Sequence, residues 1–345
     1  MIKSHSMGVG DVLRSSAAWR VLKNRWPTAE LHLVFLSKHS GYPTEDLIRE
    51  HHLLNSATFI TIREKSPEKR RAKRISILNL VRKIQEISRQ IQPELIIDFE
   101  SSGLRTSLLT LLAGHACQAK TVGIGQFPGR NFFYNYSAPC VADYIKSNGL
   151  TIPIDYTHRD FVALAALGLE RLNTAIELNV TTEGQQYYEA LQPRLPQDRP
   201  IMGLNIGCGT PDAMIRRPNL SDLAQVIGLL VQKYPHTILL TGADFEKSVN
   251  EEFIIAYKQL WGNTTHILNL AGETSLSGLT GLIKACSVFI SSDSGPYHMS
   301  VAQRKPTIAW FTYKETTAFH DHPWCRHLIQ PNADQFLIAF NELMA

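Results

Sequence analysis

A carboxylate stands beside two glycines near the start of the chain, in the stretch GVGD that ends at Asp11. Glycines let the backbone turn sharply and approach a ligand closely. Asp11 falls at the start of the helix predicted over 12–24, where the helix dipole favours a negative charge. Two interpretations stay open: Asp11 is a general base that faces a binding cleft, or it only caps the helix. The dinucleotide pattern G-x-G-x-x-G is not completed, because Leu13 stands at its sixth position.

A second group follows the predicted strand 288–291, in the stretch DSGPYH from Asp293 to His298. Proline is preorganised for the first position of a helix. The amides of Ser294 and Gly295 would then point into the cleft and form an anion site for a phosphate or diphosphate. His298 lies in the first helical turn, where its ring can donate to a phosphate oxygen. The alternative for His298 is a packed histidine with no ligand.

Two more turns follow predicted strands in the second half of the chain. The first is NIGCGT, which is followed by Arg216 and Arg217. Small residues allow close approach, and an arginine can clamp a diphosphate through two parallel N–H donors. The second turn runs from Gly242 to Glu246, where Glu246 either accepts hydrogen bonds from ribose hydroxyls or serves the helix dipole. The alternative for the two arginines is a solvated loop, and Cys208 within the first turn is interpreted as a packing residue.

The charge of the chain is concentrated in one stretch. The formal net charge is +4, whereas residues 63–89 carry ten basic and three acidic residues, a net +7, so the rest sums to −3. The densest basic run is Lys69, Arg70, Arg71, Lys73 and Arg74. It is either a solvated loop and helix face or a docking patch for an anionic phospholipid or glycolipid. Nucleic acid is not expected, because zinc-finger spacing and an aromatic RNA signature are both missing.

Composition excludes several classes of protein. Hydrophobic residues make up 44% of the 345, enough for real cores, and no apolar run approaches the roughly 18 residues that span a bilayer. The five cysteines are scattered and never form C-x-x-C, which argues against a disulfide framework or zinc ribbon and for a reducing cytoplasm. A D-x-D pair and a His/Cys cluster are missing from the sequence, so we expect no metal and no other cofactor.

The elements that must position these residues alternate between short β-branched runs and helical stretches. Strands are predicted over 31–36, 58–62, 95–99, 121–124, 201–206, 237–241, 288–291 and 307–311. Helices are predicted over 12–24, 44–52, 75–91, 102–113, 182–191, 220–233, 247–260, 275–284, 296–302 and 335–345. Such alternation predicts an α/β protein with two doubly wound parallel sheets. Three prolines within 193–200 mark the boundary between them. Ligands of such sheets bind outside the carboxyl ends of the strands.

Several of these motifs resemble those of a known family. The segment NLAGETSL over 269–276, followed by DSGPYH, is similar to the N-L-A-G-x-T-S-L and D-[ST]-G-x-x-H motifs of the bacterial heptosyltransferases, glycosyltransferase family 9. The GVGD turn resembles the N-terminal turn of this family, and Gly242 to Glu246 its ribose contact. The resemblance covers residues from about 7 to 315. The apolar residues that usually precede the first turn are few here, so we expect a shortened start.

The resemblance implies a GT-B fold of two Rossmann-like domains that face a cleft. We expect an acceptor domain over 1–170, a linker over 171–199, a donor domain over 200–325, and a C-terminal helix within 326–345 that packs back on the first domain. It implies a cytoplasmic inverting transferase, peripheral on the inner face of the membrane, that moves heptose from ADP-heptose onto lipopolysaccharide core. Asp11 would be the base, and Lys69, Arg70, Arg71, Lys73 and Arg74 would bind the acceptor. The donor residues would be Gly207, Gly209, Thr210, Arg216, Arg217, Gly242, Glu246, Asp293, Ser294, Gly295 and His298.

The family pattern has a lysine after the turn that corresponds to NIGCGT. This chain has Arg216 and Arg217 there, and one of them is expected to supply the phosphate cation. Two other functions stay open. One is a nucleotide-sugar isomerase of the same two-domain fold, which would convert an activated sugar without an acceptor. The other is a non-catalytic subunit that binds a nucleotide sugar and shows no turnover.

Overall fold

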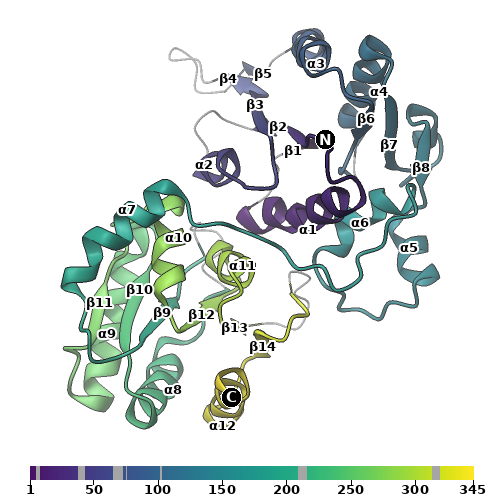
Figure 1. Ribbon diagram of the computed structural model, residues 1–345. Helices are drawn as coiled ribbons and strands as arrows, with labels where there is room; N and C mark the ends of the chain where they lie inside the picture. Colours follow the sequence, from purple (N-terminus) through teal and green to yellow (C-terminus); the bar gives the residue numbers. More distant parts are fainter. Residues whose placement is uncertain are drawn as a thin grey trace. The chain divides into compact units, whose positions relative to one another are not determined.

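The computed structural model describes residues 1–4, 8–37, 43–64, 73–74, 76–101, 103–208, 216–312 and 319–345 (Figure 1). The chain forms two compact units, Met1–Ala175 and Ile176–Ala345. Each unit contains a parallel sheet with helices packed against it.

The first unit contains two three-stranded parallel sheets that meet at one bridge. The strands are β1 (Ile2–Ser4), β2 (His32–Ser37), β3 (Ser56–Thr61), β6 (Leu95–Ile97), β7 (Lys120–Ile124) and β8 (Tyr136–Ala138). A parallel bridge between Ile2 and Asp98 joins β1 to β6, which gives the order β3-β2-β1-β6-β7-β8. This is the Rossmann order, in which the direction of winding reverses between the first and fourth strands. The reversal therefore lies between β1 and β6.

Helices and short pieces complete the first unit. They are α1 (Val9–Arg25), α2 (Pro43–Arg49), the strands β4 (Arg63–Glu64) and β5 (Lys73–Arg74), α3 (Ile77–Ile91), α4 (Arg105–Cys117), η1 (Arg130–Phe133), α5 (Val141–Ser147) and α6 (His158–Ala165). The helical spacing predicted for α3 is confirmed: Leu80 and Ile84 are buried and pack with Leu109 and Ala113 of α4. Ser76 caps α3 by accepting a hydrogen bond from the amide of Leu78.

The second unit repeats the same strand order in one sheet. Its parallel strands are β9 (Ile201–Asn205), β10 (Thr237–Thr241), β11 (Ile267–Asn269), β12 (Val288–Ser292), β13 (Thr307–Phe311) and β14 (Cys325–Ile329). They are arranged as β11-β10-β9-β12-β13-β14, so the winding reverses between β9 and β12. The core on one face of this sheet includes Leu204, Ile238, Phe253 and Phe336, all of which are fully buried.

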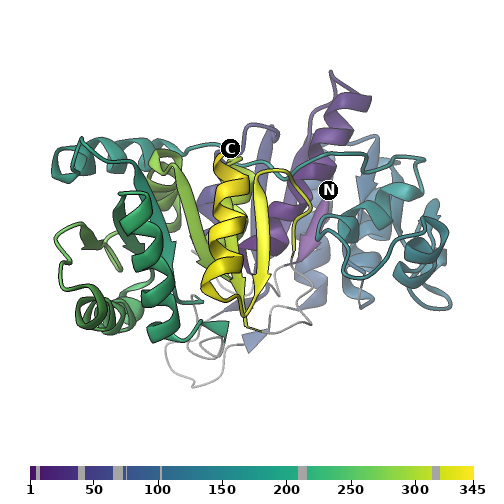
Figure 2. The same cartoon turned by 90° about the horizontal axis from the view of Figure 1, so that it is seen from below.

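Two groups of helices pack around the second sheet. The elements are α7 (Thr182–Leu191), η2 (Gln192–Arg194), α8 (Leu220–Lys233), η4 (Asp244–Glu246), α9 (Lys247–Trp261), α10 (Leu276–Ala285), α11 (Gly295–Ala302) and α12 (Ala333–Met344). Helix α8 contacts α9 and α12, whereas α10 contacts α7 and α11. Figure 2 shows α12 beside β14, which it contacts. Among the described residues, the longest and most apolar helices still fall short of what a membrane span requires.

The boundaries of the units differ from those expected. The segment predicted as a linker, 171–199, contains α7, which packs on α10 as part of the second unit. Thr181 is buried there and its hydroxyl donates to the carbonyl of Ser277 at 3.0 Å. Helix α12 packs on α8, β13 and β14, because Phe336 and Phe340 complete the core of its own unit. The contact of α12 with the first domain stays a prediction.

The packing of α7 on α10 requires two glycines. A Cβ atom at Gly281 would lie 1.9 Å from the carbonyl oxygen of Gly184, and one at Gly184 would lie 2.8 Å from the amide nitrogen of Gly281. Both obstacles are backbone atoms, so a side chain at either position must push the helices apart. Gly278 lies in the same helix α10, and its added Cβ would meet only ordinary contacts of 3.6 Å or more.

We predict that Gly281→Ala lowers the free energy of unfolding by about 1–3 kcal/mol, the usual cost of overpacking a tight contact. Gly278→Ala should be neutral or slightly stabilising, because alanine favours a helix and nothing obstructs it. Urea denaturation of the two variants beside the wild type measures both values. Equal stability of the two variants would show that α7 and α10 do not depend on this close approach.

Candidate active site

The candidate base Asp11 lies in the first turn of α1, as the sequence predicts. Gly8 precedes this helix in an extended conformation, and the Asp11 amide donates to the Gly8 carbonyl at 3.2 Å. The Asp11 carboxylate accepts hydrogen bonds from Arg14 Nη1 at 3.0 Å and from the Tyr156 hydroxyl. It remains 16% exposed. The carboxylate is thus held on one side by two donors while part of it faces solvent.

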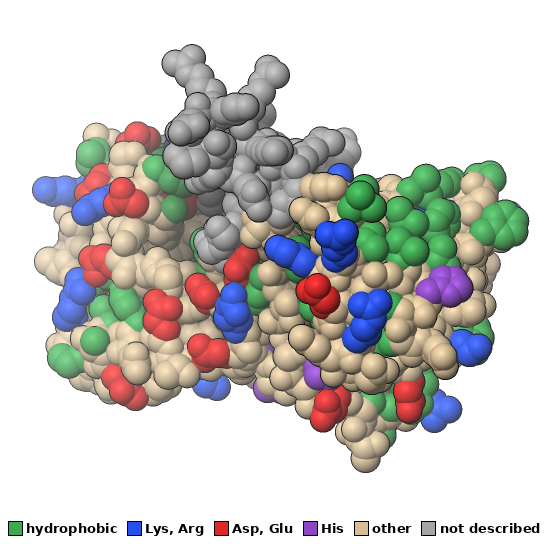
Figure 3. All heavy atoms as spheres, turned by 90° about the horizontal axis from the view of Figure 1, so that it is seen from above, with side chains coloured by type: hydrophobic (Ala, Val, Ile, Leu, Met, Phe, Trp, Pro, Cys, Tyr) green, Lys and Arg blue, Asp and Glu red, His purple; other side chains and the backbone are tan. Residues whose placement is uncertain are grey.

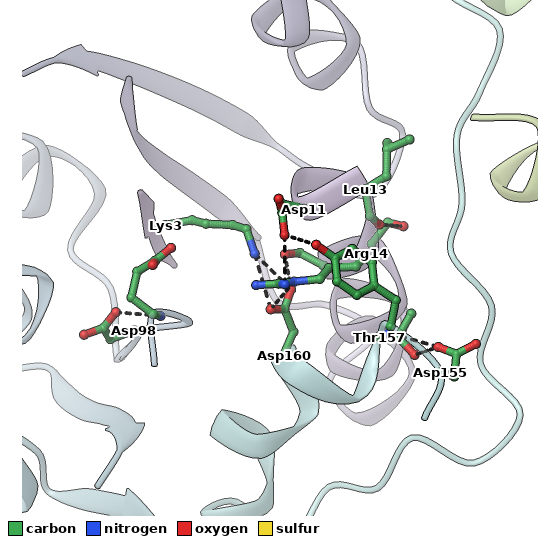
Figure 4. A network of polar contacts seen from close by, with 12 residues as sticks. Lys3, Asp11, Leu13, Arg14, Asp98, Asp155, Thr157 and Asp160 are labelled. Atoms are coloured by element: carbon green, nitrogen blue, oxygen red, sulfur yellow. Dashed lines mark hydrogen bonds and ion pairs between the residues drawn. The ribbon is translucent and has the colours of Figure 1, made fainter. Parts of the chain in front are cut away.

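Behind Asp11 lies a buried network centred on Asp160 of α6. Its carboxylate accepts from Arg14 Nε at 3.0 Å, from Lys3 Nζ at 3.1 Å, and from the Ser15 hydroxyl. Figure 4 shows Arg14 between Asp11 and Asp160, with Lys3 reaching in from β1. Arg14 therefore connects the partly exposed carboxylate to the fully buried one. Through these contacts α6 fixes both the start of α1 and the end of β1.

The network favours the charged form of Asp160, whereas burial lowers the pKa of Lys3 although the Asp160 carboxylate beside it favours the cation. Burial alone would raise the pKa of Asp160, but the adjacent Arg14 and Lys3 outweigh it, and the pKa lies below its ordinary value. Burial raises the pKa of Tyr156 well above its usual range; the Arg14 cation opposes this shift and the Asp11 carboxylate adds to it. Tyr156 therefore stays protonated near neutral pH, and its hydroxyl donates a hydrogen bond to Asp11. The Arg14 guanidinium also lies 5.0 Å from the centroid of the Tyr156 ring.

The other side of the same reversal point holds a second buried network. Asp98 follows β6 and accepts a hydrogen bond from the Tyr134 hydroxyl at 2.7 Å. Arg130 is fully buried and donates to the Ser107 hydroxyl at 2.9 Å and to the Ser101 carbonyl at 2.6 Å. Burial raises the pKa of Asp98 to about 6, although the Tyr134 hydrogen bond favours the charged form. This network fixes the loop between β6 and α4.

In the second unit, the predicted phosphate turn lies at the reversal point between β9 and β12. Ser294 stands at the N-cap position of α11, but its hydroxyl makes no capping hydrogen bond and instead donates to Asn205 Oδ1 at the end of β9, at 2.8 Å. Asp293 is buried, and its carboxylate lies 3.6 Å from Arg216 Nη1, whose side chain is 43% exposed. The start of α11, which includes Gly295, and Arg216 therefore lie at one edge of the sheet. Amides at a helix start together with an arginine suit an anion.

Glu246 is positioned by its own turn. It is buried, and its Oε2 accepts a hydrogen bond from the Ala243 amide at 2.7 Å. A Cβ atom at Gly207 would lie 1.6 Å from Glu246 Oε1, so any side chain at this position would have to displace the carboxylate. Gly242 has a φ of +157° and lies against the same side chain. The geometry supports the interpretation of Glu246 as the residue that closes the turn, and its ribose contact stays a prediction.

His298 is buried and paired with another histidine. Its Nδ1 lies 2.8 Å from Nε2 of His320, whose amide in turn donates to the Tyr297 hydroxyl at 3.0 Å. One ring nitrogen of His298 thus contacts another side chain of the protein, as the interpretation of a packed histidine predicts. The contact of His298 with a phosphate stays a prediction. Burial raises the pKa of Cys208 to about 11, which supports its interpretation as a packing residue.

Several predicted residues lie outside the described part of the chain. These are Gly209 and Thr210 of the donor turn, and Lys69, Arg70 and Arg71 of the basic run. Lys73 and Arg74 form β5, which pairs with β4 in antiparallel orientation. Arg217 is half-buried at the end of the donor turn.

The sequence pattern points to Asp11 but not to the residues that donate hydrogen bonds to it. Arg14 lies three residues from Asp11, and this i, i+3 spacing was the one local signal available. Tyr156 and Asp160 are more than 140 residues away. Asp160 belongs to α6, which the sequence did not predict, and Tyr156 lies in the turn just before that helix. Lys3 stands in a strand of three residues, too short to give a periodic pattern.

Comparisons with known proteins agree with the sequence pattern. The model of glycosyltransferase family 9 (heptosyltransferase) matches residues 161–337. Lipopolysaccharide heptosyltransferase 2 of Escherichia coli K12 is 29% identical over 133 residues, which are 38% of this chain and 36% of that relative. The chain thus matches about a third of that relative's length.

Solved structures resemble the whole chain. E. coli ADP-heptose lipopolysaccharide heptosyltransferase II has a TM-score of 0.66 at 18% identity, covering 99% of this chain and 98% of that one. E. coli heptosyltransferase WaaC with ADP-2-deoxy-2-fluoro heptose has a TM-score of 0.59 at 14% identity, covering 100% and 99%. These likenesses confirm the predicted α/β GT-B fold with Rossmann-like parallel sheets.

We predict that Asp160→Asn lowers the free energy of unfolding by about 3–5 kcal/mol, because it leaves Arg14 as a buried cation without this carboxylate and removes the buried ionic partner of Lys3. Asp11→Asn should cost far less, since Asp11 is partly exposed and Arg14 keeps Asp160. Urea denaturation of each variant near neutral pH checks this order.

The cost of Asp160→Asn should also depend on pH. Folding lowers the pKa of Asp160, so its contribution is complete above the ordinary carboxyl pKa of about 4 and is lost as the pH falls through the folded value. The difference between wild type and variant should therefore shrink below about pH 4. If the difference in free energy of unfolding between wild type and variant stayed constant down to strongly acidic pH, Asp160 would not be charged in the folded protein.

Proposed function

Since the chain belongs to glycosyltransferase family 9, we propose that it is an inverting glycosyltransferase that moves heptose from ADP-heptose onto a lipopolysaccharide core or a related glycan, with Asp11 as the general base. The observation that carries this proposal is the geometry of Asp11. Its carboxylate is partly exposed at the start of α1 and is oriented by Arg14 and Tyr156. A carboxylate held in this way can accept a proton without rearranging.

In the proposed reaction, Asp11 removes the proton from an acceptor hydroxyl as the oxygen attacks the anomeric carbon. The bond from that carbon to the diphosphate breaks on the opposite face, which inverts the configuration. Asp11 ends protonated and the nucleoside diphosphate leaves with the bonding electrons. Arg14 is well suited to keep Asp11 oriented, because its second contact, to Asp160, is buried and fixed.

The donor is proposed to bind at the reversal point of the second sheet. Negative charge grows on the leaving diphosphate, and donors already in place stabilise such charge most effectively. The start of α11 at Ser294 and Gly295 and the cation of Arg216 meet this requirement. The E. coli WaaC structure with an ADP-heptose analogue supports the choice of donor. We expect no obligatory metal, since these groups already supply positive charge to the diphosphate.

The acceptor is proposed to be an anionic glycolipid. The basic stretch 63–89 lies in the first unit, which also contains Asp11. We expect the protein to act in the cytoplasm, peripherally on the inner face of the membrane, where Lys69 to Arg74 would attract phosphorylated or acidic sugars.

We predict that Asp11→Asn lowers kcat by about 10²–10⁴-fold, the typical contribution of a general base. The affinity for ADP-heptose should not change, because Asp11 belongs to the first unit and the donor residues to the second. Turnover is measured by release of ADP with a lipopolysaccharide-core acceptor, and donor affinity by isothermal titration calorimetry.

The same experiment separates the alternatives. Transfer retained by Asp11→Asn would remove Asp11 from the role of base. Conversion of the nucleotide sugar without an acceptor would indicate an isomerase, and donor binding without any turnover would indicate a binding subunit. A thermal-shift screen of ADP, UDP and GDP sugars tests the donor: stabilisation by UDP or GDP forms instead of ADP-heptose would redirect the assignment.

A further inference from the structure

Exposed hydrophobic side chains gather at one edge of the first unit. Ile77 and Leu78 begin α3, Leu104 directly precedes α4, and Phe127 and Phe132 follow β7. We call these five residues the apolar edge. Phe132 is 84% exposed and Leu78 is 68% exposed. Figure 3 looks onto the side of α3 and α4 and shows hydrophobic side chains in a continuous field, with Lys and Arg side chains along its border.

Helix α4 extends this field, because it is apolar on both of its faces. Leu109 and Ala113 are buried against the sheet and α3. On the outer side, Leu108, Leu111 and Leu112 are only half-buried and continue the row that begins at Leu104. A helix in water normally presents a polar outer face. An apolar outer face of this kind marks a surface that contacts a partner or a membrane.

Cations surround the apolar edge. Arg82 and Lys83 of α3 and Arg105 of α4 are all exposed. Arg82 lies four residues after Leu78, so the two side chains share one face of α3. The one acidic residue of α3 is Glu86. The local charge is therefore positive and complements an anionic surface.

We propose that the apolar edge docks on a lipid bilayer that carries anionic headgroups. The side chains of Leu78 and Phe132 are mostly exposed, which suits insertion between lipids. Flanking Lys and Arg bind the headgroups while apolar side chains enter the interface, as in other peripheral membrane proteins.

Docking of this edge gives the enzyme a defined orientation. Helices of a Rossmann-like unit begin at the carboxyl edge of the sheet, so the starts of α3 and α4 and the segment after β7 lie along the same edge as the start of α1. Asp11 stands at that start. The proposed docking therefore turns the edge with Asp11 toward the bilayer. This orientation rests on the proposed function, whereas lipid binding itself does not.

The test measures flotation of the full chain with vesicles of pure phosphatidylcholine and of phosphatidylcholine with phosphatidylglycerol. We expect binding to the anionic vesicles, and about a tenfold loss for the double variant Leu78→Ser, Phe132→Ser, since insertion depends on buried apolar area. A matched control is Ile255→Ser, Ile338→Ser, which changes two residues that are each 58% exposed on the second unit. The control should bind like the wild type. Arg82→Glu, Lys83→Glu should weaken the preference for anionic vesicles, because Arg105 and the basic run from Lys69 to Arg74 remain.

Failure of the wild type to float with anionic vesicles, or equal binding by the Leu78, Phe132 variant, would overturn the proposal. A wild-type dimer that this variant dissociates, without a change in flotation, would show that a second copy covers the edge. Vesicle binding is measured without donor or acceptor, so its failure leaves transfer untested. Transfer to a delipidated acceptor by the Leu78, Phe132 variant should equal that of the wild type.

Discussion

The first unit depends on the contacts that the buried carboxylate of Asp160 makes with Lys3 and Arg14. This carboxylate lies fully buried between Lys3 and Arg14, and so it ties together β1, α1 and α6, which are separated by up to 157 residues in the chain. A buried carboxylate and the basic groups that contact it are stable inside a protein only while they remain together. Arg14 contacts Asp160 through Nε, and its Nη1 donates a hydrogen bond to Asp11. Orientation of the candidate base is thus a by-product of satisfying a buried charge.

Both units use the same topology for different chemistry. Each sheet reverses its winding beside its first strand, and each gathers polar residues at that point. In the first unit the residues are carboxylates with their own buried cations, which suits proton transfer. In the second unit they are hydroxyls, the start of α11 and a partly exposed arginine, which suits a diphosphate. A common scaffold therefore places the proposed base in one half and the proposed anion site in the other.

The sequence allowed much of this to be predicted where local patterns are strong. The limits of α7, α8, β10 and β13 agree with the structure to the residue, since each has clear caps or a continuous apolar run. Strands β1, β4, β5, β8, β11 and β14 and helices α5 and α6 were not predicted. All of these strands except β14 have only two or three residues, too few to show a periodic pattern. Strand β14 lies at the edge of its sheet, and Cys325 is its one buried residue, so it has no continuous apolar run.

The site was predictable to the same degree. Turns with glycine and a carboxylate or hydroxyl identified Asp11 and Ser294 because their neighbours in sequence are their structural context. Tyr156 and Asp160 could not be found, since long-range pairing leaves no local trace. The ambiguity of Glu246 also had a physical reason: a first-turn carboxylate that caps its own turn has the same spacing as one that binds a sugar.

The pair formed by His298 and His320 has a consequence for where a proton resides. A neutral imidazole carries one N–H, so only one of the two rings can donate across the 2.8 Å between His298 Nδ1 and His320 Nε2. A neutral His298 that donated from Nε2 to an anion would have to accept at Nδ1, and His320 would then carry its proton on Nε2. Binding of the anion would thus favour one tautomer in each ring. The positions of the two protons would then depend on whether an anion is bound.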